Sequence, residues 1–273
     1  MDADVERYLA DLVDRARAVL GDNLIAAYAA GSIALDAYVR GRSDVDVALV
    51  CEDAVELDRK RELVSGLRHE ATPCPARGLE LVLYRREVAR SGTPEPGFEV
   101  ELNSGPGMAF RATYAVDERP AADGRFWYGL DRSILHERGH ALFGAAPGEM
   151  FADLSPAHLR GLLIDALEWW IARPTPAADE PAPGAEDAVL GACRSLVKVR
   201  YGVWLAKAEA GTRLIDAGYP ADLIERSIQA RDGGRPPGGQ AARAFQQQVM
   251  NEIAAGPRAR HEPAPRAARP ASG

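Results

Sequence analysis

The chain has 273 residues, of which 47% are apolar and 27% are charged, and its net charge is −7. This composition is typical of a soluble globular protein with one large or two ordinary domains. The acidic balance argues against a protein that binds nucleic acid through a broad basic surface. The lack of an apolar run of about 18 residues argues against a transmembrane helix. We therefore expect no nucleic-acid partner and no contact with a membrane.

The N-terminus is acidic and has no signal-peptide core. The three cysteines, Cys51, Cys74 and Cys193, are an odd number and lack the spacing of metal ligands. Cys51 and Cys193 fall in apolar patterns, which favours packed thiols. These features predict a monomeric protein of the reducing cytoplasm.

The first half of the chain mixes helical and strand patterns. Apolar residues recur at helical spacing over residues 5–20, so the chain opens with an amphipathic helix. Alternation and turn residues predict the elements that follow. These are strands at 24–30, 44–50, 78–84 and 98–103, and helices at 33–39 and 54–70. In the last strand, period two places Glu99, Glu101 and Asn103 on one side.

From about residue 130 the pattern becomes helical, and a Pro-rich loop over 173–185 interrupts it. The expected helices are near 159–170, 189–197, 205–217, 221–231 and 242–253. The fold class is therefore α+β: a mixed sheet with flanking helices over residues 1–150, then an α-helical bundle domain over 151–255. Residues 256–273 cannot bury a core and are expected to be a disordered tail. We expect the active site in the cleft between the two domains.

The most informative motif is a Gly-Ser pair, Gly31-Ser32, followed by two alternating aspartates, Asp44 and Asp46. On a strand both carboxylates point to the same face, and they repel each other unless a cation lies between them. Backbone N–H groups of a Gly-Ser turn can approach a phosphate. Mg²⁺ prefers oxygen ligands and shares them with phosphates. The motif therefore predicts a site for Mg²⁺-bound nucleoside triphosphate, with Arg42 near enough in sequence to assist.

A carboxylate on the neighbouring strand would be placed to remove the proton of an acceptor hydroxyl. Glu80, in the segment G-L-E-L-V-L-Y, meets this description. The alternative interpretations are a third metal ligand and an ordinary strand glutamate without a catalytic role.

The pattern at Gly31, Ser32, Asp44 and Asp46 resembles the nucleotidyltransferase superfamily. The stretch around Glu80 is similar to that of aminoglycoside adenylyltransferases of the streptomycin/spectinomycin type, and the similarity extends to about residue 255. Arg194, Gly202 and Lys207 match a helical segment of that family, whereas Val203 replaces a family lysine.

This resemblance implies an enzyme that transfers AMP from ATP to an antibiotic hydroxyl with Mg²⁺ and releases pyrophosphate. It implies that Glu80 is the catalytic base and that Lys207 reaches the nucleotide phosphates. It also implies an acidic cleft for a cationic small molecule, for which Glu101 and Asp131 are the preferred pair and Glu99 a further candidate. The loop over 174–186 lacks the family's tryptophan. Streptomycin is therefore not the expected acceptor, while spectinomycin, another aminocyclitol or an unrelated alcohol stays open.

The segment His136-Glu137-Arg138-Gly139-His140 satisfies the H-E-x-x-H pattern of zinc proteases. Gly139 weakens a helix, and Arg138 would bring a cation near Zn²⁺. We interpret the segment as the end of a helix.

Two other functions stay open at this level. One is a minimal nucleotidyltransferase that adenylates a protein, as in toxin–antitoxin pairs, although the long helical half disfavours it. The other is a non-catalytic nucleotide-binding protein, which the intact trio of Asp44, Asp46 and Glu80 disfavours.

Overall fold

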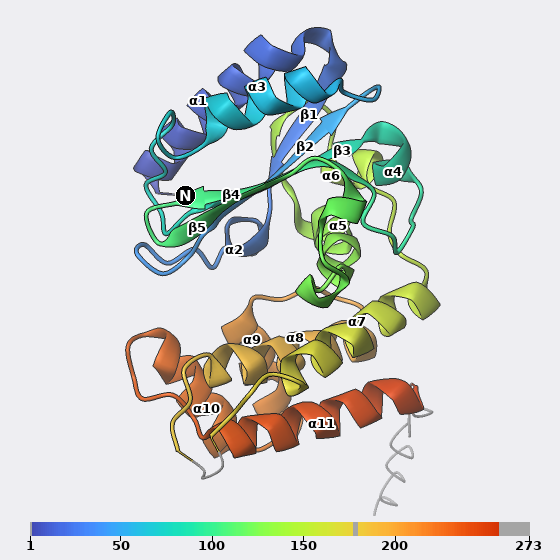
Figure 1. Ribbon diagram of the computed structural model, residues 1–273. Coiled ribbons are helices and arrows are strands. Elements are labelled where there is room, and N and C mark those ends of the chain that lie inside the picture. The colour runs from blue at the N-terminus through green and yellow to red at the C-terminus, as the bar shows by residue number, and fades with distance from the viewer. Residues whose placement is uncertain (1, 177–179, 257–273) are drawn as a thin grey trace, which may run out of the picture.

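The computed structural model describes residues 2–176 and 180–256. Its centre is a six-stranded mixed sheet in the order β5-β4-β3-β2-β1-β6 (Figure 1). The strands are β1 (Leu24–Ala29), β2 (Val45–Cys51), β3 (Leu79–Arg85), β4 (Phe98–Gly105), β5 (Met108–Thr113) and β6 (His140–Phe143). Strands β2 and β3 are parallel, and the other neighbouring pairs are antiparallel.

One face of the sheet is covered by α1 (Ala3–Leu20) and α3 (Leu57–Leu67), as Figure 1 shows. Asp2 caps α1 by accepting a hydrogen bond from the N–H of Asp4. The apolar face of α1 includes Leu9 and Leu12, which pack with Leu49 and Leu81 of the sheet. This amphipathic pairing gives the protein its first core cluster.

The other face of the sheet is covered by α5 (Phe126–Arg138) and α6 (Pro147–Met150). Tyr28, Tyr84 and Phe98 from the sheet pack with Tyr128 of α5 and with Phe151. The short helices α2 (Gly31–Ala34) and α4 (Arg86–Arg90) connect strands. Both faces of the sheet are therefore buried, each against its own set of helices.

The rest of the described chain is helical: α7 (Pro156–Ile171), α8 (Ala185–Tyr201), α9 (Lys207–Asp216), α10 (Ala221–Arg231) and α11 (Gly239–Ala255). We call α7–α11 the helical half and the elements before them the sheet half. Helix α8 lies in the centre of the helical half, where Val189, Leu190 and Leu196 are buried against its neighbours. Gly202 ends α8 in the left-handed conformation with φ of 75°.

A fourth apolar cluster joins the two halves. It contains Leu130 and Ile134 of α5, Leu162 and Leu163 of α7, and the fully buried Trp204. The N–H of Trp204 and the ammonium group of Lys198 both bind the carboxylate of Glu137, at 2.7 and 2.8 Å. The boundary predicted near residue 150 falls at the end of α6, and the division into two independent domains stays a prediction.

Several sequence predictions need correction. The helix expected at 33–39 is a single turn, because Asp36 takes a left-handed conformation with φ of 53°. Strands β5 and β6 were not predicted. The tail over 257–273 lies outside the described residues. No helix in the ranges 2–176 and 180–256 combines the length and apolar character that crossing a membrane requires.

Candidate active site

The predicted acidic residues of strands β2 and β3 lie together on the sheet. Asp46 is directly opposite Glu80 in the parallel register. Asp44 lies one residue before β2. Because it is two positions from Asp46, its side chain is on the same face of the sheet as that of Asp46. The structure therefore brings together the three carboxylates that the sequence singled out, on the side of the sheet that α5 covers.

The Gly31-Ser32 turn closes over Asp46. The N–H of Ala30 donates to the backbone carbonyl of Asp46 at 2.9 Å, and the N–H of Ser32 donates to its carboxylate. Gly31 has φ of 52°, and a Cβ atom at this position would lie 1.8 Å from Oδ2 of Asp46. Only glycine fits this close approach. The hydroxyl of Ser32 is buried without a hydrogen-bond partner in the described part of the chain.

A fourth carboxylate, Asp131, reaches the same region from α5. Its charge raises the pKa of Asp46, and the charge of Glu80 raises the pKa of Asp131. Arg194 of α8 provides an opposing positive charge to Asp46 and Asp131. The site is thus built from both halves of the molecule.

Burial, together with the crowding of like charges, raises the pKa values of these groups. Burial, Asp131 and Asp44 raise the pKa of Asp46 to about 7. Burial, Asp46 and Asp44 raise the pKa of Glu80 to about 7, and burial and Glu80 raise that of Asp131 to about 7. Carboxylates with such values exchange protons near neutral pH, which suits acid–base chemistry.

Asp44 differs from its neighbours because it has a direct counter-ion. Nε and Nη2 of Arg77 donate to its two carboxylate oxygens, at 2.8 and 2.6 Å. Within residues 2–176 and 180–256, no three His, Cys, Asp or Glu side chains are grouped closely enough to hold a metal ion. The donor atoms at Asp44, Asp46 and Glu80 are nevertheless all carboxylate oxygens, which are the ligands that Mg²⁺ prefers.

Positive side chains gather beside the carboxylates around one aspartate of α8. Asp187 accepts hydrogen bonds from Lys207 at 2.9 Å and from Arg231 at 2.5 Å, and Arg42 lies 3.7 Å away. Arg42 also binds Glu186 at 3.2 Å, so it links the sheet half to the helical half. The two cations that the sequence assigned to the nucleotide, Arg42 and Lys207, therefore converge on one acidic partner.

The candidate acceptor residues on β4 have partners of their own. Arg111 and Arg119 both donate to the carboxylate of Glu101, and Arg111 does so at 2.8 Å. Burial raises the pKa of Glu101, but the two arginines lower it by more, so the pKa is below its ordinary value. Glu101 lies on the face of Glu80, because its strand partner is Val82.

Glu99 was predicted on that same face, and this prediction is wrong. An irregularity in the β3–β4 register between Leu83 and Tyr84 pairs Tyr84 with Phe98. The extra residue turns Glu99 toward α3, where it binds Lys60 at 2.7 Å.

The H-E-x-x-H segment does not form a helical pair of histidines. Helix α5 ends at Arg138, and His140 begins β6. His136 is hydrogen-bonded through Nδ1 to the carbonyl of Phe151 at 2.6 Å, and Glu137 is used at the junction described above. This confirms the interpretation of the segment as the end of a helix.

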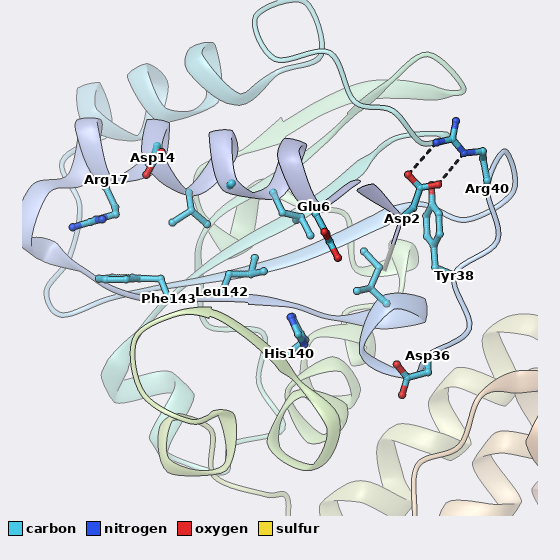
Figure 2. A pocket seen from close by; sticks show the side chains of 14 residues that line it. Asp2, Glu6, Asp14, Arg17, Asp36, Tyr38, Arg40, His140, Leu142 and Phe143 are labelled. Carbon is cyan, nitrogen blue, oxygen red and sulfur yellow. Dashed lines mark hydrogen bonds and ion pairs between the residues drawn. The ribbon is translucent and has the colours of Figure 1, made fainter. Parts of the chain in front are cut away.

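A cavity of about 110 Å³ lies between α5, α7, α8 and α9, and Asp131, Asp187, Arg194 and Lys207 are among its lining residues. Trp127, Trp170 and Trp204 also line it. A larger cavity of about 860 Å³ lies between α1 and β6 (Figure 2). None of the predicted site residues lines the larger one, and two of its acidic groups, Asp2 and Asp36, are near Arg40 and Arg138. The smaller cavity is lined by two of the predicted site residues, Asp131 and Lys207, but not by Asp44, Asp46 or Glu80.

Comparison with known proteins supports the fold. No protein-family model matches the chain, and no curated protein matches it in sequence. Among solved structures, the chain is similar to the spectinomycin adenyltransferase AAD(9) from Enterococcus faecialis, solved with ATP and spectinomycin. The TM-score is 0.60 at 16% sequence identity, and the match covers 91% of this chain and 98% of that chain. The chain shares the fold of that enzyme. The resemblance stated from the motifs is therefore supported at the level of the fold.

The sequence did not point to Arg77, Asp187 or Arg231. Arg77 precedes Glu80 by three residues and could have been noticed as a cation beside the base. Asp187 and Arg231 join the site only through the packing of α8 against α10, for which the sequence gives no direct signal.

Proposed function

We propose that the protein is a nucleotidyltransferase that moves AMP from ATP to a hydroxyl of a small cationic acceptor. The observation that carries this proposal is the register that pairs Asp46 with Glu80, one strand away from the Gly31-Ser32 turn. The fold shared with an adenyltransferase supports the same reaction class.

In this proposal Asp44 and Asp46 hold Mg²⁺, which would neutralise charge on the triphosphate. Ser32 is suited to contact a phosphate because its buried hydroxyl lacks a partner among the described residues. Lys207, Arg42 and Arg194 are suited to the same anion, since positive side chains preorganised near a polyphosphate stabilise it.

Glu80 acts as the general base. The acceptor oxygen forms a bond to the α-phosphorus, the bond from this phosphorus to the bridging oxygen breaks, and pyrophosphate leaves. The proton of the acceptor hydroxyl passes to Glu80. The raised pKa of this carboxyl, about 7, lets it take up that proton near neutral pH.

Asp131 is the favoured contact for the acceptor's positive charge. Its side chain lines the cavity of about 110 Å³. Glu101 keeps its place as a candidate, but its charge is already balanced by Arg111 and Arg119. An aminocyclitol is the first acceptor to test. Spectinomycin is one example, since the structurally similar adenyltransferase was solved with it.

Release of pyrophosphate from ATP and Mg²⁺ in the presence of individual aminocyclitols tests the proposal. Acceptor-dependent release, with AMP found on the small molecule, supports it. AMP found on a polypeptide would favour a protein-adenylating enzyme. ATP binding without release for any acceptor would favour a non-catalytic nucleotide-binding protein.

A further inference from the structure

Arg77 and Asp44 form a bidentate ion pair in which both carboxylate oxygens accept a hydrogen bond. Nε donates to Oδ1 at 2.8 Å and Nη2 donates to Oδ2 at 2.6 Å. A two-bond geometry of this kind fixes the orientation of both groups. The guanidinium remains accessible, because the Arg77 side chain is 51% exposed while that of Asp44 is 17% exposed.

The surrounding backbone is shaped to seat Arg77. The N–H of Gly107, in the β4–β5 turn, donates to the carbonyl of Arg77 at 2.9 Å. A Cβ atom at Gly107 would lie 2.7 Å from Cγ of Arg77, so a larger residue in the turn would displace the side chain. This close packing distinguishes the pair from an ordinary surface ion pair, whose long side chains are free to move.

Three acidic residues act on the Arg77 guanidinium. The hydrogen bond to Asp44 raises the pKa of Arg77, and the charges of Glu80 and Asp187 raise it further. Arg77 therefore interacts with the proposed metal ligand Asp44, the proposed base Glu80 and the carboxylate of Asp187 in α8.

We propose that Arg77 is the resident counter-ion of Asp44, which holds this carboxylate while no metal is bound and releases it to a divalent ion that arrives with the nucleotide. The inference rests on the proposed function only in assigning Asp44 to the metal. A guanidinium and a divalent ion compete for the same negative charge because both need its oxygens. A nucleotide polyphosphate supplies the negative charge with which the released guanidinium can then pair.

The consequence is that metal binding depends on the nucleotide. A free divalent ion must displace Arg77 without offering it a new partner, so it binds weakly. A metal–nucleotide complex offers that partner and binds more readily. Removing Arg77 should therefore strengthen binding of the free ion and weaken its dependence on ATP.

Titration of the nucleotide-free protein with Mn²⁺, followed by the electron paramagnetic resonance signal of free Mn²⁺, tests this. We expect Arg77→Ala and Arg77→Gln to bind Mn²⁺ roughly threefold to fivefold more tightly than the parent, the order expected for loss of one accessible ion pair. Arg15→Ala is the matched control, since it removes an equal charge from an exposed pair on α1. Thermal melts would show that each variant is folded.

A double-mutant comparison identifies the carboxylate concerned. In an Asp44→Asn background, Arg77→Ala should leave Mn²⁺ affinity unchanged, because the contested oxygens have been altered. An equal rise in that background, or an unchanged or lower affinity in folded Arg77→Ala, would overturn the proposal. The titration needs no acceptor and no turnover. Absence of AMP transfer therefore counts against the proposed function alone, and transfer without the Mn²⁺ effect counts against the role of Arg77 alone.

Discussion

Asp46 and Glu80 lie side by side in the parallel pair β2–β3, and the negative charge of Asp46 raises the pKa of Glu80. Strand pairing alone sets this relationship, since neighbouring parallel strands present facing residues on one side of the sheet. The two groups have different proposed roles. Asp46, the proposed metal ligand, is next to the Gly31-Ser32 turn, while Glu80, the proposed base, is one strand further from it.

Glu80→Gln should lower kcat by about 10²–10⁴-fold and leave ATP affinity nearly unchanged, because a general base acts in the transition state rather than in nucleotide binding. Pyrophosphate release and calorimetric titration with Mg²⁺ and ATP measure the two quantities. Glu225→Gln, on the exposed surface of α10, is the control. A loss of ATP affinity as large as the loss of kcat would indicate that Glu80 is a metal ligand and not the base.

Gly31→Ala should destabilise the protein and abolish nucleotide binding, because its Cβ atom would lie 1.8 Å from Oδ2 of Asp46. Two control variants separate the causes. Gly41→Ala carries the left-handed strain alone, with φ of 79° and open space around it, and should cost about 1 kcal/mol. Gly161→Ala in α7 has neither problem and should stabilise by about 0.5–1 kcal/mol. Thermal unfolding of the three variants checks the order, and equal losses at positions 31 and 41 would contradict it.

Asp131→Asn should stabilise the protein in a pH-dependent manner. The pKa of Asp131 is raised from its ordinary value of 3.8 to about 7, first by burial and then by Glu80. Between about pH 4 and about pH 7 the folded protein thus binds more protons than the unfolded chain, and its stability falls as the pH rises. The melting temperature of the variant should exceed that of the parent at about pH 8, and the two should converge near about pH 4. Asp165→Asn, on the exposed surface of α7, controls for loss of an acidic charge.

Asp187→Asn should strengthen polyphosphate binding while it lowers stability. Lys207 and Arg231 would lose the carboxylate that they now share, and their positive charge would become available to an anion. Calorimetric titration with inorganic tripolyphosphate in the absence of metal measures the first effect, for which we expect a gain of roughly threefold to tenfold. Asp216→Asn at the exposed end of α9 is the control. Weaker binding in the variant would mean that Asp187 orients the cations for the anion rather than occupying them.

Much of the site could be predicted because its parts are local patterns. The alternation around Asp44 and Asp46 and the Gly-Ser pair follow from periodicity and turn chemistry. The facing of Asp46 and Glu80 required only that their strands be neighbours in register. The sequence could not predict on which face of the sheet each acidic residue of β4 lies. The bulge that turns Glu99 to the other face arises from the pairing of β4 with β3.

The predictions failed where distant segments decide the outcome. Arg77 is 33 positions from Asp44 in sequence, and their pairing depends on the β4–β5 turn. Helix α2 is short because Asp36 leaves the helical conformation, although the residues around it favour a longer helix. Strand β6 follows a helix directly and has only four residues, too few for a periodic signal.

The burial of Trp204 at the junction of the two halves provides an optical signal. Its indole is 1% exposed and donates to the hydroxyl of Ser133, whereas Trp127, Trp169 and Trp170 are only partly buried. Acrylamide should therefore quench the emission of those three and spare that of Trp204 for as long as the halves stay together. Separation of the halves by denaturant would then be visible as the loss of a protected, blue-shifted component, without any attached dye.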